Sequence, residues 1–157
     1  MKVKNIFSLS VFLFIWLFTS PIYAQKNPLL GVWLTDVKSH VTMEKCGNAY
    51  CGYISKVSIR PKLYEKNKQA IDKIGVENAY DYFNKNPDLR SRRLLGLQVL
   101  IVEKKQSDII YSGEVYNPED GKTYKGKVEL LNNTQLRLSG CILMGLLCQS
   151  EIWYRIK

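Results

Sequence analysis

Residues 123–131 read Thr-Tyr-Lys-Gly-Lys-Val-Glu-Leu-Leu and carry the clearest structural signal in the chain. Small or apolar residues alternate there with charged ones, and those of one parity are Tyr124, Gly126, Val128 and Leu130. Successive side chains of a strand point to opposite faces, so the pattern is typical of an antiparallel strand with one buried and one solvated face. We therefore expect a mainly β protein.

Seven further segments have strand character, and turn-forming residues separate them, most clearly in residues 117–121 and 132–133. All but one of the connections are short, and eight meandering strands can close on themselves and so remove their exposed edges. We expect a single eight-stranded antiparallel up-and-down barrel. The further strands are expected in residues 31–36, 40–45, 50–57, 95–103, 109–116, 135–141 and 150–156.

The exception is the long connection between the third and fourth strands, which covers residues 58–93. Its apolar positions Ile71, Ile74, Tyr80 and Phe83 indicate a helix over residues 67–82. Gly75 disfavours that helix because glycine weakens a helix interior.

The first residues have the layout of a cleaved secretory signal. Residues 1–4 are basic, residues 6–18 are apolar apart from serine, and Ala24 offers a small residue at the cleavage site. The apolar run is shorter than the ~20 residues that cross a bilayer. We therefore expect a signal peptide over 1–24, one exported domain over 25–157, and no transmembrane segment after cleavage.

The four cysteines predict two disulfides, because export leads to an oxidising compartment. In an up-and-down barrel, successive turns alternate between the two ends. Cys46 and Cys51 flank the second turn, whereas Cys141 and Cys148 flank the seventh, so the two pairs should lie at opposite ends. Of the three possible connectivities we favour the local one, which pairs Cys46 with Cys51 and Cys141 with Cys148. The spacings do not match a zinc site and His40 is the single histidine, so we expect no bound metal.

Seven short pieces lie along the chain in a fixed order: Gly31-Val32-Trp33, Cys46-Gly47, Cys51-Gly52, Asn84-Lys85-Asn86-Pro87, residues 92–97, residues 116–124 and Trp153-Tyr154-Arg155. As an ordered set they resemble the bacterial domain-of-unknown-function 2147 family of small exported proteins. The resemblance implies a lipocalin-like barrel in the periplasm or outside a bacterial cell, and it implies no established activity. The family more often has an aspartate at the position of Asn117.

Trp33 on the first strand and Arg155 on the last are also similar to the lipocalin signature. The two strands meet where the barrel closes, and a guanidinium can lie over an indole face while it donates to carbonyls at that end. We interpret Trp33 and Arg155 as a structural clasp.

No pattern in the chain indicates catalysis. Nucleophile-elbow and phosphate-loop motifs are absent, and residues 81–92 fail as a calcium loop because the sixth and twelfth positions are Asn86 and Arg92. Glu114 and Asp120 form a carboxylate pair only if the fold brings them together. We expect no catalytic residues and no cofactor, and favour a protein without enzymatic activity.

The leading hypothesis is a binding protein for a small apolar or amphipathic ligand. Aromatic side chains that point into a barrel suit such a ligand, and the apolar run at residues 142–147 should share one end with the long connection and the turn at residues 117–121. The candidate ligand-binding residues are Tyr111, Tyr116, Tyr124, Trp153, Asn86 and Arg90.

The alternative hypothesis is an envelope interaction protein that uses a basic face and the apolar loop tip at residues 142–147, and whose barrel core is filled by side chains. The chain has a net charge of +9, which falls to +7 after Lys2 and Lys4 leave with the signal. Arg90, Arg92 and Arg93 would then bind an anionic envelope component or another protein. Nucleic acid is not an expected partner, because an exported protein seldom meets it.

Overall fold

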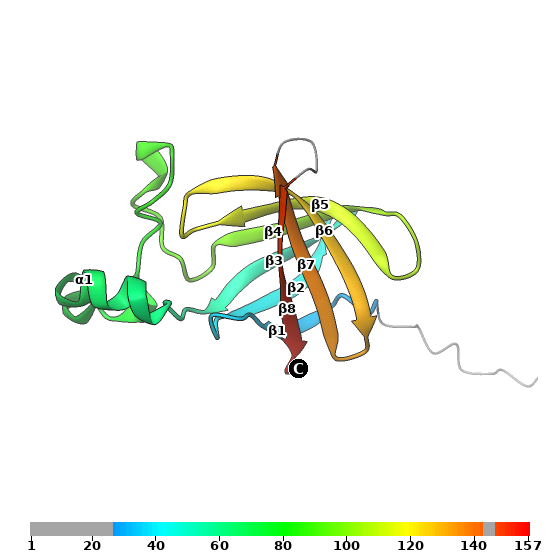
Figure 1. Ribbon diagram of the computed structural model, residues 1–157, viewed down its shortest axis with the longest axis horizontal. Helices are drawn as coiled ribbons and strands as arrows, with labels where there is room; N and C mark the ends of the chain where they lie inside the picture. Colours follow the sequence, from blue (N-terminus) through cyan, green and yellow to red (C-terminus); the bar gives the residue numbers. More distant parts are fainter. Residues whose placement is uncertain (1–26, 143–146) are drawn as a thin grey trace, which may run out of the picture.

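The structure, a computed structural model, describes residues 27–142 and 147–157 and is a closed antiparallel barrel of eight strands (Figure 1). Each strand pairs with the next, and the last pairs with the first, which confirms the predicted barrel. The predicted signal peptide and residues 143–146 of the apolar tip lie outside the described residues. The strands are β1 (Gly31–Leu34), β2 (His40–Cys46), β3 (Ala49–Lys56), β4 (Gln98–Lys105), β5 (Ile110–Asn117), β6 (Lys122–Asn132), β7 (Gln135–Ile142) and β8 (Leu147–Arg155).

Two strand boundaries differ from the prediction by three residues. β4 begins at Gln98 rather than at residue 95, because residues 94–97 form a turn in which the Leu97 amide donates to the Leu94 carbonyl at 3.0 Å. β8 begins at Leu147 rather than at residue 150, because its ladder with β7 continues through the pair Cys141 and Cys148.

The insertion between β3 and β4 contains helix α1 (Pro61–Ile74), and the predicted bounds of 67–82 were wrong at both ends. Pro61 stands at the start, where its fixed φ fits a helix and its missing N–H is not needed. The helix ends before Gly75, whose φ of 82° interrupts it, and short 3₁₀ helices follow at Val76–Asn78 and Pro87–Leu89. Within the described residues, no helix combines the length and apolarity needed to cross a bilayer.

Both predicted cysteine pairs are disulfide-bonded in the structure. Cys46 is bonded to Cys51 across the β2–β3 turn, and Cys141 to Cys148 across β7 and β8. Because turns alternate along the meander, the two disulfides lie at opposite ends of the barrel. Each ties two neighbouring strands at a hairpin.

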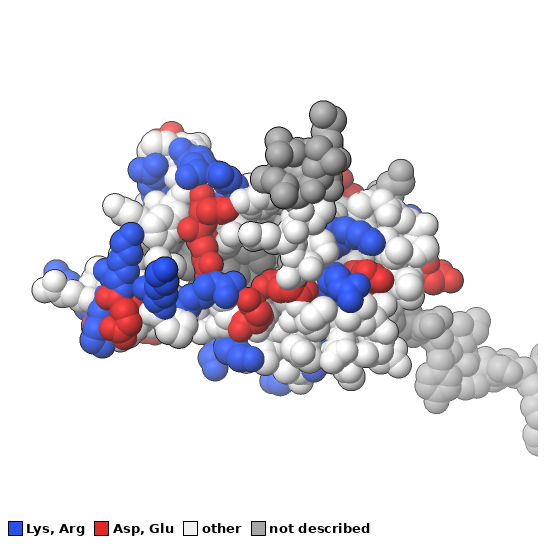
Figure 2. Space-filling model, in the orientation of Figure 1, with Lys and Arg blue, Asp and Glu red and all other residues white. Residues whose placement is uncertain are grey.

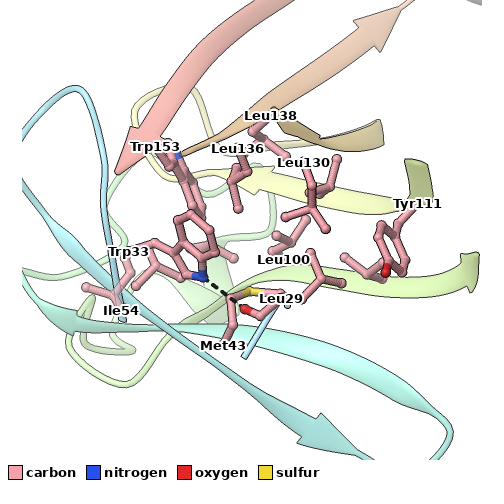
Figure 3. Close-up of a cluster of buried hydrophobic side chains, with 14 of the residues drawn as sticks. Leu29, Trp33, Met43, Ile54, Leu100, Tyr111, Leu130, Leu136, Leu138 and Trp153 are labelled. Atoms are coloured by element: carbon pink, nitrogen blue, oxygen red, sulfur yellow. Dashed lines mark hydrogen bonds between the residues drawn. The ribbon is translucent and has the colours of Figure 1, made fainter. Parts of the chain in front are cut away.

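Apolar side chains fill one half of the barrel (Figure 3). The alternation predicted in β6 is confirmed, since Val128 and Leu130 are buried while Lys125 and Lys127 are exposed. The residues that reach only this filled half include Leu29, Trp33, Met43, Leu100, Val102, Tyr111, Val128, Leu130 and Leu136.

Trp33 lies at the centre of the filled half and is fully buried. Its indole N–H donates to the Leu29 carbonyl at 2.9 Å, which draws the segment before β1 into the barrel end (Figure 3). Trp33 pairs with Arg155 across β1 and β8, and the guanidinium carbon lies 4.3 Å from the indole centroid. This distance is within the range of a cation–π contact.

Arg155 also donates hydrogen bonds to three backbone carbonyls at this end. Its Nε donates to the Asn133 carbonyl at 2.8 Å, and its two terminal nitrogens donate to the carbonyls of Pro28 and Leu30. Gly31 has a φ of 133°, and a Cβ there would overlap the Lys157 carbonyl and the Arg155 guanidinium. Glycine is therefore required where the guanidinium passes over β1.

We predict that Trp33→Ala lowers the free energy of unfolding by about 3–5 kcal/mol, because a fully buried aromatic is lost. Arg155→Ala should lower it by about 1–3 kcal/mol, because charged hydrogen bonds are lost. Both substitutions break the same contact, so the double variant should lose less than the sum by at least about 0.5 kcal/mol. Denaturant unfolding of the four proteins measures this coupling.

Arg93→Ala is the matched control, since Arg93 lies in the insertion and donates to Asn78 at 2.8 Å. Its effect should add to that of Trp33→Ala. Additive losses for the Trp33 and Arg155 pair would contradict the clasp.

Candidate functional site

The other half of the barrel holds a cavity of about 1320 Å³. It opens at the end where the β1–β2, β3–β4, β5–β6 and β7–β8 connections meet, and residues from all four connections or the strand ends beside them line it. Figure 1 shows the insertion, in green, beyond this end of the barrel. The barrel is therefore filled at one end and hollow at the other.

The floor of the cavity is the side of the apolar core that faces the insertion. Five buried residues belong to both, and Trp153 is the largest of them. Residues of α1 at helical spacing form one wall, which places a single face of the helix toward the cavity. The floor residues are Val41, Ile54, Val99, Leu138 and Trp153, and the helix contributes Leu63, Asn67, Ala70, Ile71, Lys73 and Ile74.

A buried polar network attaches the insertion to the barrel. The Asp81 carboxylate is fully buried and accepts hydrogen bonds from Tyr116 Oη at 2.6 Å, Asn84 Nδ2 at 2.8 Å and Arg92 Nε at 2.8 Å. Burial and the bond to Asp81 raise the pKa of Tyr116 to about 12, so its hydroxyl remains a donor. A buried carboxylate is tolerated when its lone pairs are satisfied in this way.

The β5–β6 turn packs directly against the insertion. Gly121 has a φ of 68°, and a Cβ there would overlap the carbonyl of Phe83. Glycine therefore allows this close approach, which brings residues 117–120 to the cavity wall.

Arg60, immediately before α1, bridges two turns at the mouth of the cavity. Its Nε donates to Glu119 of the β5–β6 turn at 2.9 Å, and its Nη2 donates to Asp36 of the β1–β2 turn at 3.0 Å. The three side chains are 37–47 % exposed, so solvent weakens each ion pair, but together they link the insertion to two turns.

Glu151 on β8 faces Asp36 at the cavity wall. The two carboxyl groups are within hydrogen-bonding reach, and the Trp153 indole N–H donates to Glu151. Burial, followed by the hydrogen bond with Asp36, raises the pKa of Glu151 to about 7. The same hydrogen bond lowers the pKa of Asp36. At neutral pH Glu151 is therefore about half protonated, and the proton that it holds is shared with the ionised Asp36.

The structure brings together three of the six residues that the sequence suggested for a ligand. Tyr116, Tyr124 and Trp153 line the cavity, whereas Tyr111 lies in the filled half.

The other two residues, Asn86 and Arg90, do not line the cavity. Asn86 caps a 3₁₀ helix by accepting from the Asp88 amide at 3.1 Å, and Arg90 Nε donates to the Asn84 carbonyl at 2.9 Å. Both residues shape the insertion.

The structure also separates the two carboxylates considered for acid–base chemistry. Asp120 lines the cavity and accepts a hydrogen bond from the Tyr124 hydroxyl, whereas Glu114 is exposed and absent from the lining. The carboxyl groups that do meet are those of Asp36 and Glu151, a pairing that was not among the predicted ones. The sequence does contain one indication for Glu151. It lies two residues before the inward-facing Trp153 on β8, so both side chains are on the same face of the strand.

The arginine cluster of the alternative hypothesis is engaged within the insertion. Arg92 bonds to Asp81, Arg93 to Asn78, and Arg90 to a backbone carbonyl. These contacts explain the cluster structurally.

Comparison with known proteins agrees with this architecture. The sequence profile of DUF2147, described as an uncharacterised protein conserved in bacteria, matches residues 31–155. Among solved structures, the chain is similar to HP1028 from Helicobacter pylori, which is described as a member of the lipocalin family. That match has a TM-score of 0.63 and 24% identity, and it covers 82% of this chain and 83% of the other. No curated protein sequence matches significantly.

We predict that Glu151→Gln changes the pH dependence of stability. The pKa of Glu151 is about 7 in the fold and 4.5 in its ordinary state, so the folded chain holds the proton more tightly. Its contribution is therefore fully present below about pH 4.5 and is lost as pH rises to about 7. Glutamine cannot ionise, so the variant should gain about 1–2 kcal/mol over the native protein between about pH 5 and pH 8.

Urea unfolding at a series of pH values measures this difference. Glu114→Gln, at an exposed carboxylate outside the cavity, should follow the native curve. Parallel curves for Glu151→Gln and the native protein would refute the coupling of the two carboxyl groups.

Proposed function

The chain belongs to the DUF2147 family of uncharacterised bacterial proteins, and we propose that it is an exported binding protein that holds a small apolar or amphipathic ligand in the open half of its barrel. The observation that carries this proposal is the cavity of about 1320 Å³ above an apolar floor. Small-molecule sites are concave, mostly apolar and about 300–1,000 Å³ in volume, so the cavity has room for a ligand of this class.

The aromatic and aliphatic side chains around the cavity support the proposal, because several remain solvent-exposed. Ile74 is 38%, Phe83 38%, Tyr80 44% and Tyr82 72% exposed, and all four line the cavity. Apolar side chains gathered in a concave surface are favourable contacts for a ligand that removes them from water.

The polar groups at the cavity wall favour an amphipathic ligand over a purely apolar one. Asp36, Arg60 and Glu119 surround the mouth, while Trp153 and its neighbours form the floor. A ligand with an apolar body and a polar head would match both surfaces.

The two disulfides support export, since disulfides persist in oxidising compartments such as the periplasm. A periplasmic or secreted location would suit a protein that shields an apolar molecule from water.

Filling the cavity should abolish binding of an apolar probe. Ala70 lies on the face of α1 that lines the cavity, so Ala70→Trp should weaken binding of the neutral fluorophore N-phenyl-1-naphthylamine at least about tenfold. Gln69→Trp places the same side chain on the same helix outside the cavity lining and should leave the affinity unchanged. Equal loss in both variants would place the probe elsewhere on the protein.

A natural ligand should accompany the protein when it is purified from its own host without detergent. Native mass spectrometry should then show a mass larger than that of the chain, and the Ala70→Trp variant should lack the addition. A native protein that carries no small molecule and binds no apolar probe would argue against the proposed function.

A further inference from the structure

The charge of the cavity lining is opposite to that of the whole protein. The chain has a net charge of +9, yet four carboxyl side chains and two basic ones line the cavity. Figure 2 shows acidic side chains on both sides of the hollow in this face of the molecule. The carboxyl groups are Asp36, Glu119, Asp120 and Glu151, and the basic groups are Arg60 and Lys73.

One of the two basic side chains, Arg60, already forms ion pairs with carboxyl groups of the protein. Arg60 donates to both Asp36 and Glu119, so its charge is balanced within the protein. Lys73 is exposed in the last turn of α1. Among residues 27–142 and 147–157, no salt bridge neutralises Glu151.

Glu151 stands where the apolar floor meets the acidic mouth. Trp153, two residues along β8, is a floor residue and donates its indole N–H to the Glu151 carboxyl. Asp36 approaches the same carboxyl from the β1–β2 turn. An ammonium group placed between Asp36 and Glu151 would be attracted to both oxygens and would take over the role of the shared proton.

Aromatic rings provide a second, independent preference for a cation. Six aromatic side chains line the cavity, and ring faces attract cations through their quadrupoles. These residues are Tyr80, Tyr82, Phe83, Tyr116, Tyr124 and Trp153.

We propose that the cavity selects amphiphiles with a cationic, amine-type head, which Asp36 and Glu151 hold while the apolar body lies against the floor around Trp153. The inference rests on the proposed function and adds the class of ligand. An anionic head would meet Asp36 and Glu151 without an unpaired arginine beside them, so fatty acids should bind less tightly than amines of the same length.

Three probes that differ only in their heads test the selection: decylammonium, 1-decanol and decanoate. The two ionic probes are used below their micellar concentrations and decanol below its solubility limit, and each displaces N-phenyl-1-naphthylamine from the native protein at about pH 8. We expect decylammonium to bind at least about tenfold more tightly than decanol, and decanoate to bind more weakly than both.

A pH series adds a readout that a merely apolar cavity would not give. The groups facing Glu151 are Asp36 from the β1–β2 turn, Arg60 before α1 and Trp153 on β8, with Glu119 reached through Arg60. Glu151 must lose its proton to pair with the ammonium, so decylammonium should bind about tenfold more weakly at pH 6 than at pH 8. Decanol should show no such change.

Glu151→Gln and Asp36→Asn should reduce the preference of amine over alcohol to less than about threefold, and Glu151→Gln should remove its pH dependence. Glu114→Gln is the matched control and should retain both. Decanol binding that persists in all variants shows that each of them folds.

The possible failures are distinguishable. Equal binding of the amine and the alcohol, or tighter binding of decanoate, in a native protein that binds decanol and the fluorophore would overturn the inference and leave the proposed function standing. Failure of all three probes and of the fluorophore to bind would overturn both.

Discussion

The closure between β1 and β8 is the constraint on which the rest of the structure depends. β1 has only four residues, and two register pairs join it to β8, one of which is Trp33 with Arg155. The guanidinium covers the indole and binds carbonyls of Pro28, Leu30 and Asn133, so one side chain connects both strands to the neighbouring turn. A short ladder can close the barrel because these contacts add to the backbone hydrogen bonds that Val32 makes with Ile156 and Lys157.

This closure also determines which end of the barrel is filled. Leu29 and Trp33 occupy the closing end, and Trp153 covers them from the other side. At the opposite end, polar contacts attach the insertion to the barrel around the mouth of the cavity. Asp81 accepts a hydrogen bond from Tyr116, and Arg60 forms ion pairs with one residue in each of two turns. Because these contacts lie around the mouth, they leave the space between α1 and Trp153 open. The open half follows from where the polar anchors are placed.

Sequence alternation predicted the strands well because each strand has one face inward, so a repeat of two reports burial directly, as β6 illustrates with Val128 and Leu130. The two local disulfides followed from the order of the turns. The helix bounds were wrong because Ile71 and Ile74 lie in α1, whereas Tyr80 and Phe83 follow after Gly75, although all four side chains line one cavity. The pairing of Asp36 with Glu151 was not predictable from local pattern, since it joins a turn after the first strand to the last strand. Tyr111 shows the limit of the alternating pattern. The pattern predicts that the side chain points into the barrel, but it does not predict which half of the barrel the side chain occupies.

The barrel is filled around Trp33 and hollow between Trp153 and α1. A crystal of the protein under xenon pressure shows whether this is so, because xenon enters apolar space that side chains leave empty. We expect xenon density against Val41, Ile54 and Trp153 on the side of the insertion, and none around Trp33. Xenon beside Trp33, or a crystal structure in which side chains of the insertion occupy the space above Trp153, would contradict it.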